Sequence, residues 1–172
     1  DVCSLFDSVY ISFYKGLGGI AGAMLAGSAE FTENAKVWKR RHGGDLISLY
    51  PYIINAEHCM NKRIGNMKKY WRHALAAAER LNKLKGVKTV PEMPVCNMFH
   101  AYFAATKENL ESIFADIIEK YDLAIVTNFK EIDGSTCKSE LSFGDSFELI
   151  PQEILDKAFD RLESEFIKLM KK

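Results

Sequence analysis

Residues 7–27 read DSVYISFYKGLGGIAGAMLAG, and the fold class is inferred from this segment. Its first part, Val9–Phe13, is β-branched and aromatic, which is typical of a short buried strand. The glycine-rich residues 15–19 then predict a turn, because glycine adopts backbone conformations that other residues avoid. A second apolar run over residues 21–26 predicts another strand. The segment therefore indicates two strands joined by a turn, with Lys15 at the end of the first strand.

Lys15 is the residue of this segment that carries chemistry. A lysine at the end of a buried strand is partly removed from water, and desolvation disfavours its charged form. The neutral amine is the nucleophile that Schiff-base chemistry requires, and neighbouring glycines allow a bulky cofactor to approach the backbone closely. An ordinary lysine that extends from a strand end into solvent explains the same residues. The physical argument alone favours that simpler interpretation.

The segment resembles a pattern of the threonine aldolase and aromatic amino acid β-eliminating lyase family, enzymes of fold type I that depend on pyridoxal 5'-phosphate (PLP). The family pattern is D-S-V-x-x-x-x-S-K-G-L-G-x-P-x-G-S-x-L-x-G. The resemblance continues without a gap through Trp38 and the basic pair Lys39-Arg40 to Gly43-Gly44. Matches in register over this length indicate similarity to the C-terminal half of such enzymes. The matching positions within the pattern are Asp7, Ser8, Val9, Lys15, Gly16, Leu17, Gly18, Gly22, Leu25 and Gly27.

The resemblance implies an α/β fold, in which the C-terminal part of a PLP-dependent transferase-like large domain is followed by a small α+β C-terminal domain. We expect residues 1–60 to end the PLP-binding large domain, residues 61–85 to form a linking helix, and residues 86–172 to form the small domain.

Local patterns predict the helices and strands of this arrangement. Ser28 is suited to cap a helix over residues 29–41, whose last turn is basic. A long helix is predicted over residues 45–85, bent near Pro51. Beyond it, strands are predicted at residues 87–90, 97–104, 123–127 and 137–143, and helices at residues 109–121 and from Pro151 onward.

The resemblance also implies roles for single residues. Lys15 would form the Schiff base with PLP and then move protons during the reaction. Arg40 matches a basic family position near the cofactor, and Lys138 falls near the family arginine that binds the substrate carboxylate. The expected substrate is a small-molecule amino acid. The expected reaction is Cα–Cβ cleavage of a β-hydroxy amino acid or elimination of a β substituent, in a homo-oligomer (dimer or tetramer).

Several positions depart from the family pattern. Tyr14 stands where the family has serine, and Ile47 stands where it has an arginine, so an anion-binding group is lost there. Lys138 keeps the charge of the late arginine but not its bidentate geometry. An enzyme acting on another amino acid, an aminotransferase of the same fold, or a non-catalytic interaction module would also fit. The family's phosphate-binding loop, aspartate and histidine precede the lysine, so we expect these 172 residues alone to bind PLP poorly.

The composition argues against other classes of protein. Lysine and arginine total 23 and aspartate and glutamate total 23, a balance that favours neither nucleic-acid nor anionic-membrane binding. Four scattered cysteines are typical of reduced thiols, and no signal peptide or membrane-spanning run is evident, so a cytoplasmic location is expected. The histidines lack metal-ligand spacing, and we expect no metal site. His100, within an apolar run, is predicted to be a hydrogen-bonded core residue.

Overall fold

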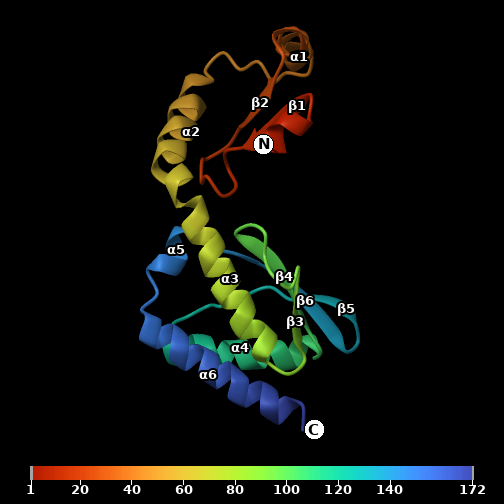
Figure 1. The fold of residues 1–172 in the computed structure, drawn as a ribbon, viewed down its shortest axis with the longest axis vertical. Helices are drawn as coiled ribbons and strands as arrows, with labels where there is room; N and C mark the ends of the chain where they lie inside the picture. Colours follow the sequence, from red (N-terminus) through yellow and green to blue (C-terminus); the bar gives the residue numbers. More distant parts are fainter. Residues whose placement is uncertain (1, 172) are drawn as a thin grey trace. The chain divides into compact units, whose positions relative to one another are not determined.

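The computed structural model describes residues 2–171, and the chain divides into two compact units, Asp1–Asn66 and Met67–Lys172. Helices and strands occur in both units, in agreement with the predicted α/β class (Figure 1). The boundary between the units lies inside the segment predicted as a linking helix, residues 61–85. The division of the sequence into three parts stays a prediction.

Unit 1 is built on the predicted hairpin. Strands β1 (Ser8–Ser12) and β2 (Ala23–Gly27) pair antiparallel, with Ser8 opposite Gly27 and Ser12 opposite Ala23. Its other elements are η1 (Val2–Leu5), α1 (Ala29–Arg41), α2 (Tyr50–Arg63) and η2 (Ile64–Asn66).

Helix α1 begins and ends as the sequence predicts. The Ser28 hydroxyl accepts a hydrogen bond from the Phe31 N–H (3.1 Å), which satisfies one of the free donors of the first turn. Three cations, Lys39, Arg40 and Arg41, occupy the last turn, where they face the negative end of the helix dipole.

The predicted helix over residues 45–85 is wrong in two respects. Pro51 does not bend a helix but lies in the first turn of α2, where its missing N–H costs no hydrogen bond. The helix is also interrupted by η2, which contains Gly65, before α3 (Met67–Lys83) begins. Glycine has a low helix propensity, which makes this a favourable place for the break.

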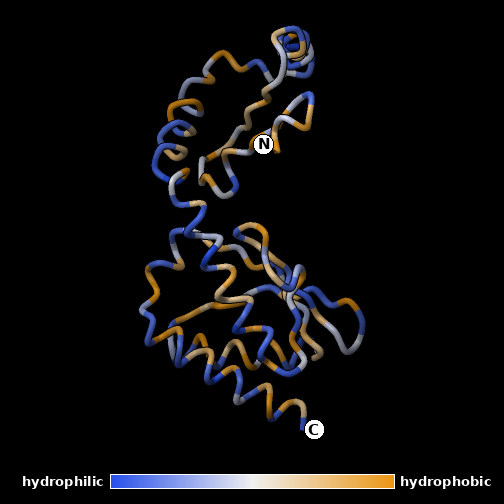
Figure 2. The backbone as a smooth tube through the Cα atoms, viewed as in Figure 1, coloured by the Kyte–Doolittle hydropathy of each residue, from blue (hydrophilic) through white to orange (hydrophobic). Residues whose placement is uncertain are grey.

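Unit 2 contains a four-stranded antiparallel sheet covered by helices on one face. The strands are β3 (Val87–Val90), β4 (Met98–Phe103), β5 (Lys130–Asp133) and β6 (Thr136–Ser142), in the order β3-β4-β6-β5. The helices are α3, α4 (Lys107–Tyr121), α5 (Asp145–Glu148) and α6 (Gln152–Leu169), with α4 packed on α6 (Figure 1). In Figure 2, hydrophobic and hydrophilic stretches alternate along α6, as expected of a helix with one buried side.

The core of unit 2 is centred on Phe103, which is fully buried. Its ring centroid lies 6.0 Å from that of Phe114 on α4, 5.7 Å from Phe129 and 6.1 Å from Phe166 on α6. Helix α3 adds Ala74, Ala78 and Leu81 to the same core. Because α3, α4 and α6 all contribute to this core, they pack on the same face of the sheet.

Two predictions in unit 2 are wrong, and one strand was not predicted. The apolar residues 123–127 form a loop whose Leu123 and Val126 are buried, since a short apolar run marks burial rather than a strand. Strand β5 was not predicted, because all four of its residues are exposed and show no apolar alternation. His100 is not in the core: the strand alternation turns Phe99 and Ala101 inward, and His100 lies half-buried on the other face, 3.6 Å from Glu140.

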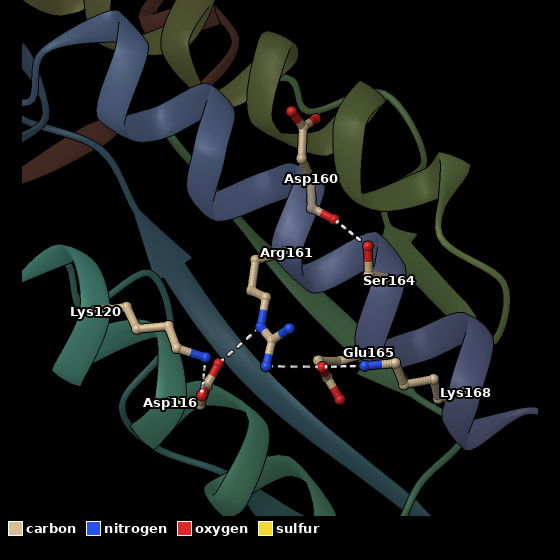
Figure 3. Close-up of polar contacts among 7 residues, drawn as sticks. All are labelled: Asp116, Lys120, Asp160, Arg161, Ser164, Glu165 and Lys168. Carbon is tan, nitrogen blue, oxygen red and sulfur yellow. Dashed lines mark hydrogen bonds and ion pairs between the residues drawn. The ribbon is translucent and has the colours of Figure 1, made fainter.

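A polar network joins α4 to α6 beside the core (Figure 3). Arg161 Nε donates to Asp116 Oδ2 (2.9 Å), and Lys120 donates to the same carboxylate (2.5 Å). Arg161 also contacts Glu165 at 3.0 Å. The hydrogen bonds from Arg161 and then Lys120 hold the pKa of Asp116 below its ordinary value.

Candidate active site

Lys15 lies in a tightly bonded turn between β1 and β2. The Gly18 N–H donates to the Lys15 carbonyl (2.8 Å), and the Gly19 N–H donates to the Phe13 carbonyl (2.7 Å). The Phe13 N–H in turn donates to the Gly22 carbonyl (3.0 Å) and closes the connection. Gly18 has φ of +73°, a conformation that favours glycine. The backbone around Lys15 is therefore fixed by local bonds, as the glycine-rich sequence predicts.

The Lys15 side chain is exposed, which corrects the predicted desolvation. Within the described residues neither strand of the hairpin is fully buried at any position, so β1 provides no apolar cover for the amine. The Lys15 Nζ atom lies 5.6 Å from the centre of the Tyr14 ring, within reach of a cation–π interaction.

Polar side chains of β1 lie near Lys15. Tyr10 and Ser12 lie on one face of the strand because strand residues alternate between faces. Hydrogen bonds with Ser12 and then Tyr14, assisted by the charge of Lys15, lower the pKa of the Tyr10 phenol. The Tyr10 hydroxyl is therefore a polar group close enough to the Lys15 amine to be affected by its charge.

Helix α2 contacts the far end of the same turn. Asn55 Oδ1 accepts a hydrogen bond from the Ile20 N–H (2.8 Å), and Cys59 Sγ lies 3.5 Å from the Gly18 carbonyl oxygen. The guanidinium of Arg63 packs directly on Gly18, since a Cβ built there would lie 1.3 Å from its Nη1 atom.

These α2 residues were not predicted from the sequence. Their spacing of four places Asn55, Cys59 and Arg63 on one helix face. That signal is weak, because many polar residues lie on α2 and only the structure distinguishes the face that meets the turn.

Arg40, predicted to bind the cofactor, is exposed in the last turn of α1. Among the described residues, no hydrogen bond, ion pair or ring contact joins its side chain to Lys15. Ile47, at the position of a family arginine, is fully exposed between α1 and α2. The role of Arg40 stays a prediction.

Lys138, predicted to bind the substrate, belongs to unit 2. It lies on β6 opposite Tyr102 of β4 and Lys130 of β5, on the sheet face that the helices do not cover. Its side chain is half-buried. A lysine directly opposite another is unfavourable unless an anion or solvent separates the charges. Its role in binding a substrate carboxylate also stays a prediction.

Unit 1 has a hollow beside the hairpin. The cavity, about 710 Å³, is formed by β2, α1 and the segment over residues 44–52, and its lining includes Met24, Leu46 and Tyr52. Residues 2–171 contain no group of three or more histidine, cysteine, aspartate or glutamate side chains arranged to hold a metal ion. Within the same residues, no helix combines the length and the apolar character needed to cross a membrane.

Comparison with known proteins places these features in a family. The model of the beta-eliminating lyase family matches residues 1–105. A crystal structure of a candidate L-allo-threonine aldolase from Listeria monocytogenes superposes with a TM-score of 0.93 at 51% identity, over 95% of this chain and 46% of that chain. A candidate aromatic amino acid beta-eliminating lyase/threonine aldolase from Exiguobacterium sp. 255-15 gives 0.91 at 46% identity, with the same coverage.

A curated relative is similar over a shorter region. Low-specificity L-threonine aldolase 1 from Arabidopsis thaliana is 29% identical over 82 residues, which are 48% of this chain and 23% of that protein. The chain thus spans about half the length of the two solved structures. The fold agrees with these structures over nearly all of the chain, and the family model covers more than half of it, so the chain belongs to the beta-eliminating lyase family.

Proposed function

We propose that Lys15 is the covalent attachment point for PLP in an enzyme that cleaves the Cα–Cβ bond of a β-hydroxy amino acid. The observation that carries the proposal is the position of Lys15. It lies in a bonded glycine turn, inside the region that the family model matches, and the sequence resemblance puts it at the family's lysine. Elimination of a β substituent is the related reaction that the same residues would support.

The residues of unit 1 fit attachment of the cofactor aldehyde. A primary amine is the required nucleophile, and the Lys15 amine is exposed and forms no ion pair with any of residues 2–171. Gly22 leaves open space beside the turn, with no atom within 4 Å of the position that a Cβ would take. Arg40 is the cation of this unit that we propose to pair with an anionic group of the cofactor.

The chain's own residues have distinct tasks in this proposal. Bound PLP would supply an electron sink for the electrons left at the substrate Cα. The Lys15 amine would hold the cofactor and, once released by the incoming amino acid, accept or donate a proton near Cα. The Tyr10 phenol, with its lowered pKa, would donate a hydrogen bond on the same face and help to orient the amine.

The exposed apolar surface of unit 1 supports a site completed by further polypeptide. Phe6, Ile20, Ile47 and Ile54 are each more than half exposed, and we propose that further polypeptide packs on them. The chain also spans only about half of its solved relatives. We propose that the whole protein covers this surface and forms a dimer or tetramer, and that residues 1–172 alone bind PLP weakly.

A second candidate function is a non-catalytic interaction module that kept the fold. The observation that favours it is Ile47, a fully exposed apolar side chain at the position of a family arginine. The two functions differ in one measurable property, the selective reaction of Lys15 with PLP.

Borohydride reduction after incubation with PLP tests the proposal. The chain is used alone and together with the part of the Listeria protein that it does not match, and peptide mass mapping locates the adducts. We expect a phosphopyridoxyl adduct at Lys15 at PLP concentrations that leave other lysines unmodified. It should be absent in Lys15→Ala and retained in Lys68→Ala, which removes an exposed lysine of α3.

Release of glycine and an aldehyde from threonine or allo-threonine by the combined polypeptides would then identify the reaction. If both preparations label Lys15 no faster than the other lysines, the enzyme is excluded and the interaction module remains.

A further inference from the structure

We propose that Asn55 is a positioning residue which, with Cys59 and Arg63, fixes the turn that carries Lys15. This inference rests on the proposed function of Lys15 and names the part of the chain that holds its amine in place. It concerns unit 1 alone, because all of these residues lie on α2 or in the β1–β2 connection.

One face of α2 is specialised for this contact. Residues 55, 56, 59, 60 and 63 are buried or half-buried, whereas Ile53 and Ile54 on other faces are 56% and 61% exposed. The covered positions recur at intervals of one helical turn. Within this face, Ala56 packs closely and the polar Asn55, Cys59 and Arg63 meet the backbone of the turn.

The bond from Ile20 to Asn55 joins segments 35 residues apart. The Ile20 side chain is 76% exposed, so the bond is not a by-product of burying that side chain. A Cβ on Gly19 would lie 3.3 Å from Asn55 Oδ1, which is closer than most side chains tolerate. The glycines at positions 18 and 19 therefore serve the approach of α2 to the turn.

The anchor reaches Lys15 through a short chain of bonds. Asn55 holds Ile20, the Gly19 N–H donates to Phe13, and the Gly18 N–H donates to Lys15. Leu17, between the lysine and the glycines, is 8% exposed and adds an apolar fixing point. A reactive group held in one geometry gains rate because less freedom is lost on reaction.

Substitution of Asn55 tests whether the turn is anchored. Asn55→Ala removes the acceptor, and Asn55→Asp keeps an oxygen acceptor at the same place. Asn61→Ala is the matched control, because Asn61 is exposed on the same helix. Hydrogen exchange of the amides of residues 16–22 is measured in the full chain. We expect exchange to be about three- to tenfold faster in Asn55→Ala, as loss of one hydrogen bond predicts, and nearly unchanged in the other two.

Labelling of Lys15 by PLP and borohydride, relative to Lys68, then tests positioning. We expect Asn55→Ala to lower this ratio and Asn55→Asp to restore it, with circular dichroism unchanged in all variants. Unchanged exchange in Asn55→Ala refutes the anchor, and faster exchange with an unchanged labelling ratio refutes its positioning role. If neither the unsubstituted chain nor its combination with the unmatched part of the Listeria protein labels Lys15 selectively, the proposed function fails, and the exchange comparison still decides whether Asn55 holds the turn.

Discussion

Two glycines near Lys15 offer a matched pair of substitutions. Gly18 and Gly22 have φ of +73° and +92°, so alanine is strained at both positions. Their surroundings differ. A Cβ on Gly18 would lie 1.3 Å from Arg63 Nη1, whereas a Cβ on Gly22 would meet nothing within 4 Å.

The structure gives an expected size for each effect. Backbone strain costs about 1–2 kcal/mol in each variant. Gly18→Ala must also displace the Arg63 guanidinium, which is the mobile end of a long side chain and can move away. The additional loss of free energy in Gly18→Ala is then that of one polar contact, about 1 kcal/mol. This additional loss should disappear when Arg63 is replaced by alanine.

Hydrogen exchange of residues 16–22 measures these costs as free energies of local opening. We expect Gly18→Ala to open about fivefold more often than Gly22→Ala, the factor that 1 kcal/mol represents. When Arg63 is replaced by alanine, Gly18→Ala should lower the free energy of local opening by no more than Gly22→Ala does in the same background. If Gly18→Ala remains the more destabilising substitution without Arg63, the contact between Arg63 and Gly18 is refuted. Equal effects of the two substitutions when Arg63 is present would refute it as well.

Further predictions concern the stability of each unit. The folded pKa of Asp116 is below its ordinary value of 3.8, so its carboxylate stabilises unit 2 above that pH, and this stabilisation is lost as the pH falls through the folded pKa. Arg161→Met should therefore lower the urea midpoint of unit 2 at pH 7 and flatten the acid dependence of its stability; an unchanged pH profile would contradict this. Phe103→Ala should destabilise unit 2 by about 3–5 kcal/mol, whereas Trp38→Ala, at a 56% exposed site, should cost about 0.5 kcal/mol or less in urea denaturation. Ser28→Ala should cost α1 about 1 kcal/mol, seen as faster amide exchange in its first turn, and Ser28→Asp should not.

Local signals account for the elements that the sequence predicted correctly. The hairpin, α1 and α6 each carry their own signal, such as the β-branched run from Val9, the cap at Ser28 and the helix start after Pro151. The same reasoning failed at residues 123–127, where burial without a strand partner leaves the same apolar pattern as a strand. It also missed β5, whose register with β6 depends on pairing and not on its own exposed residues.

The environment of Lys15 depends on contacts that no local pattern reports. Its place in the glycine turn that follows a strand was predicted correctly from residues 9–19. Its exposure was not, because burial of a strand depends on what packs against it, and no residue of β1 or β2 is fully buried. The predicted desolvation of the lysine therefore requires cover from outside residues 2–171. We therefore expect that cover to come from the polypeptide that we propose completes the site.

The glycines of residues 7–27 are needed for more than one physical reason. From the sequence, all of them fit the close approach of a cofactor to the backbone. In the structure, Gly18 and Gly19 face Arg63 and Asn55 of α2, and so the packing of unit 1 already requires them. Gly22 has a positive φ and open space beside it, so packing within unit 1 does not explain this glycine. A larger side chain at Gly22 should therefore impair binding of the polypeptide that we propose completes the site, while the contact between α2 and the turn stays intact. A larger side chain at Gly18 should instead disturb the contact with α2 first.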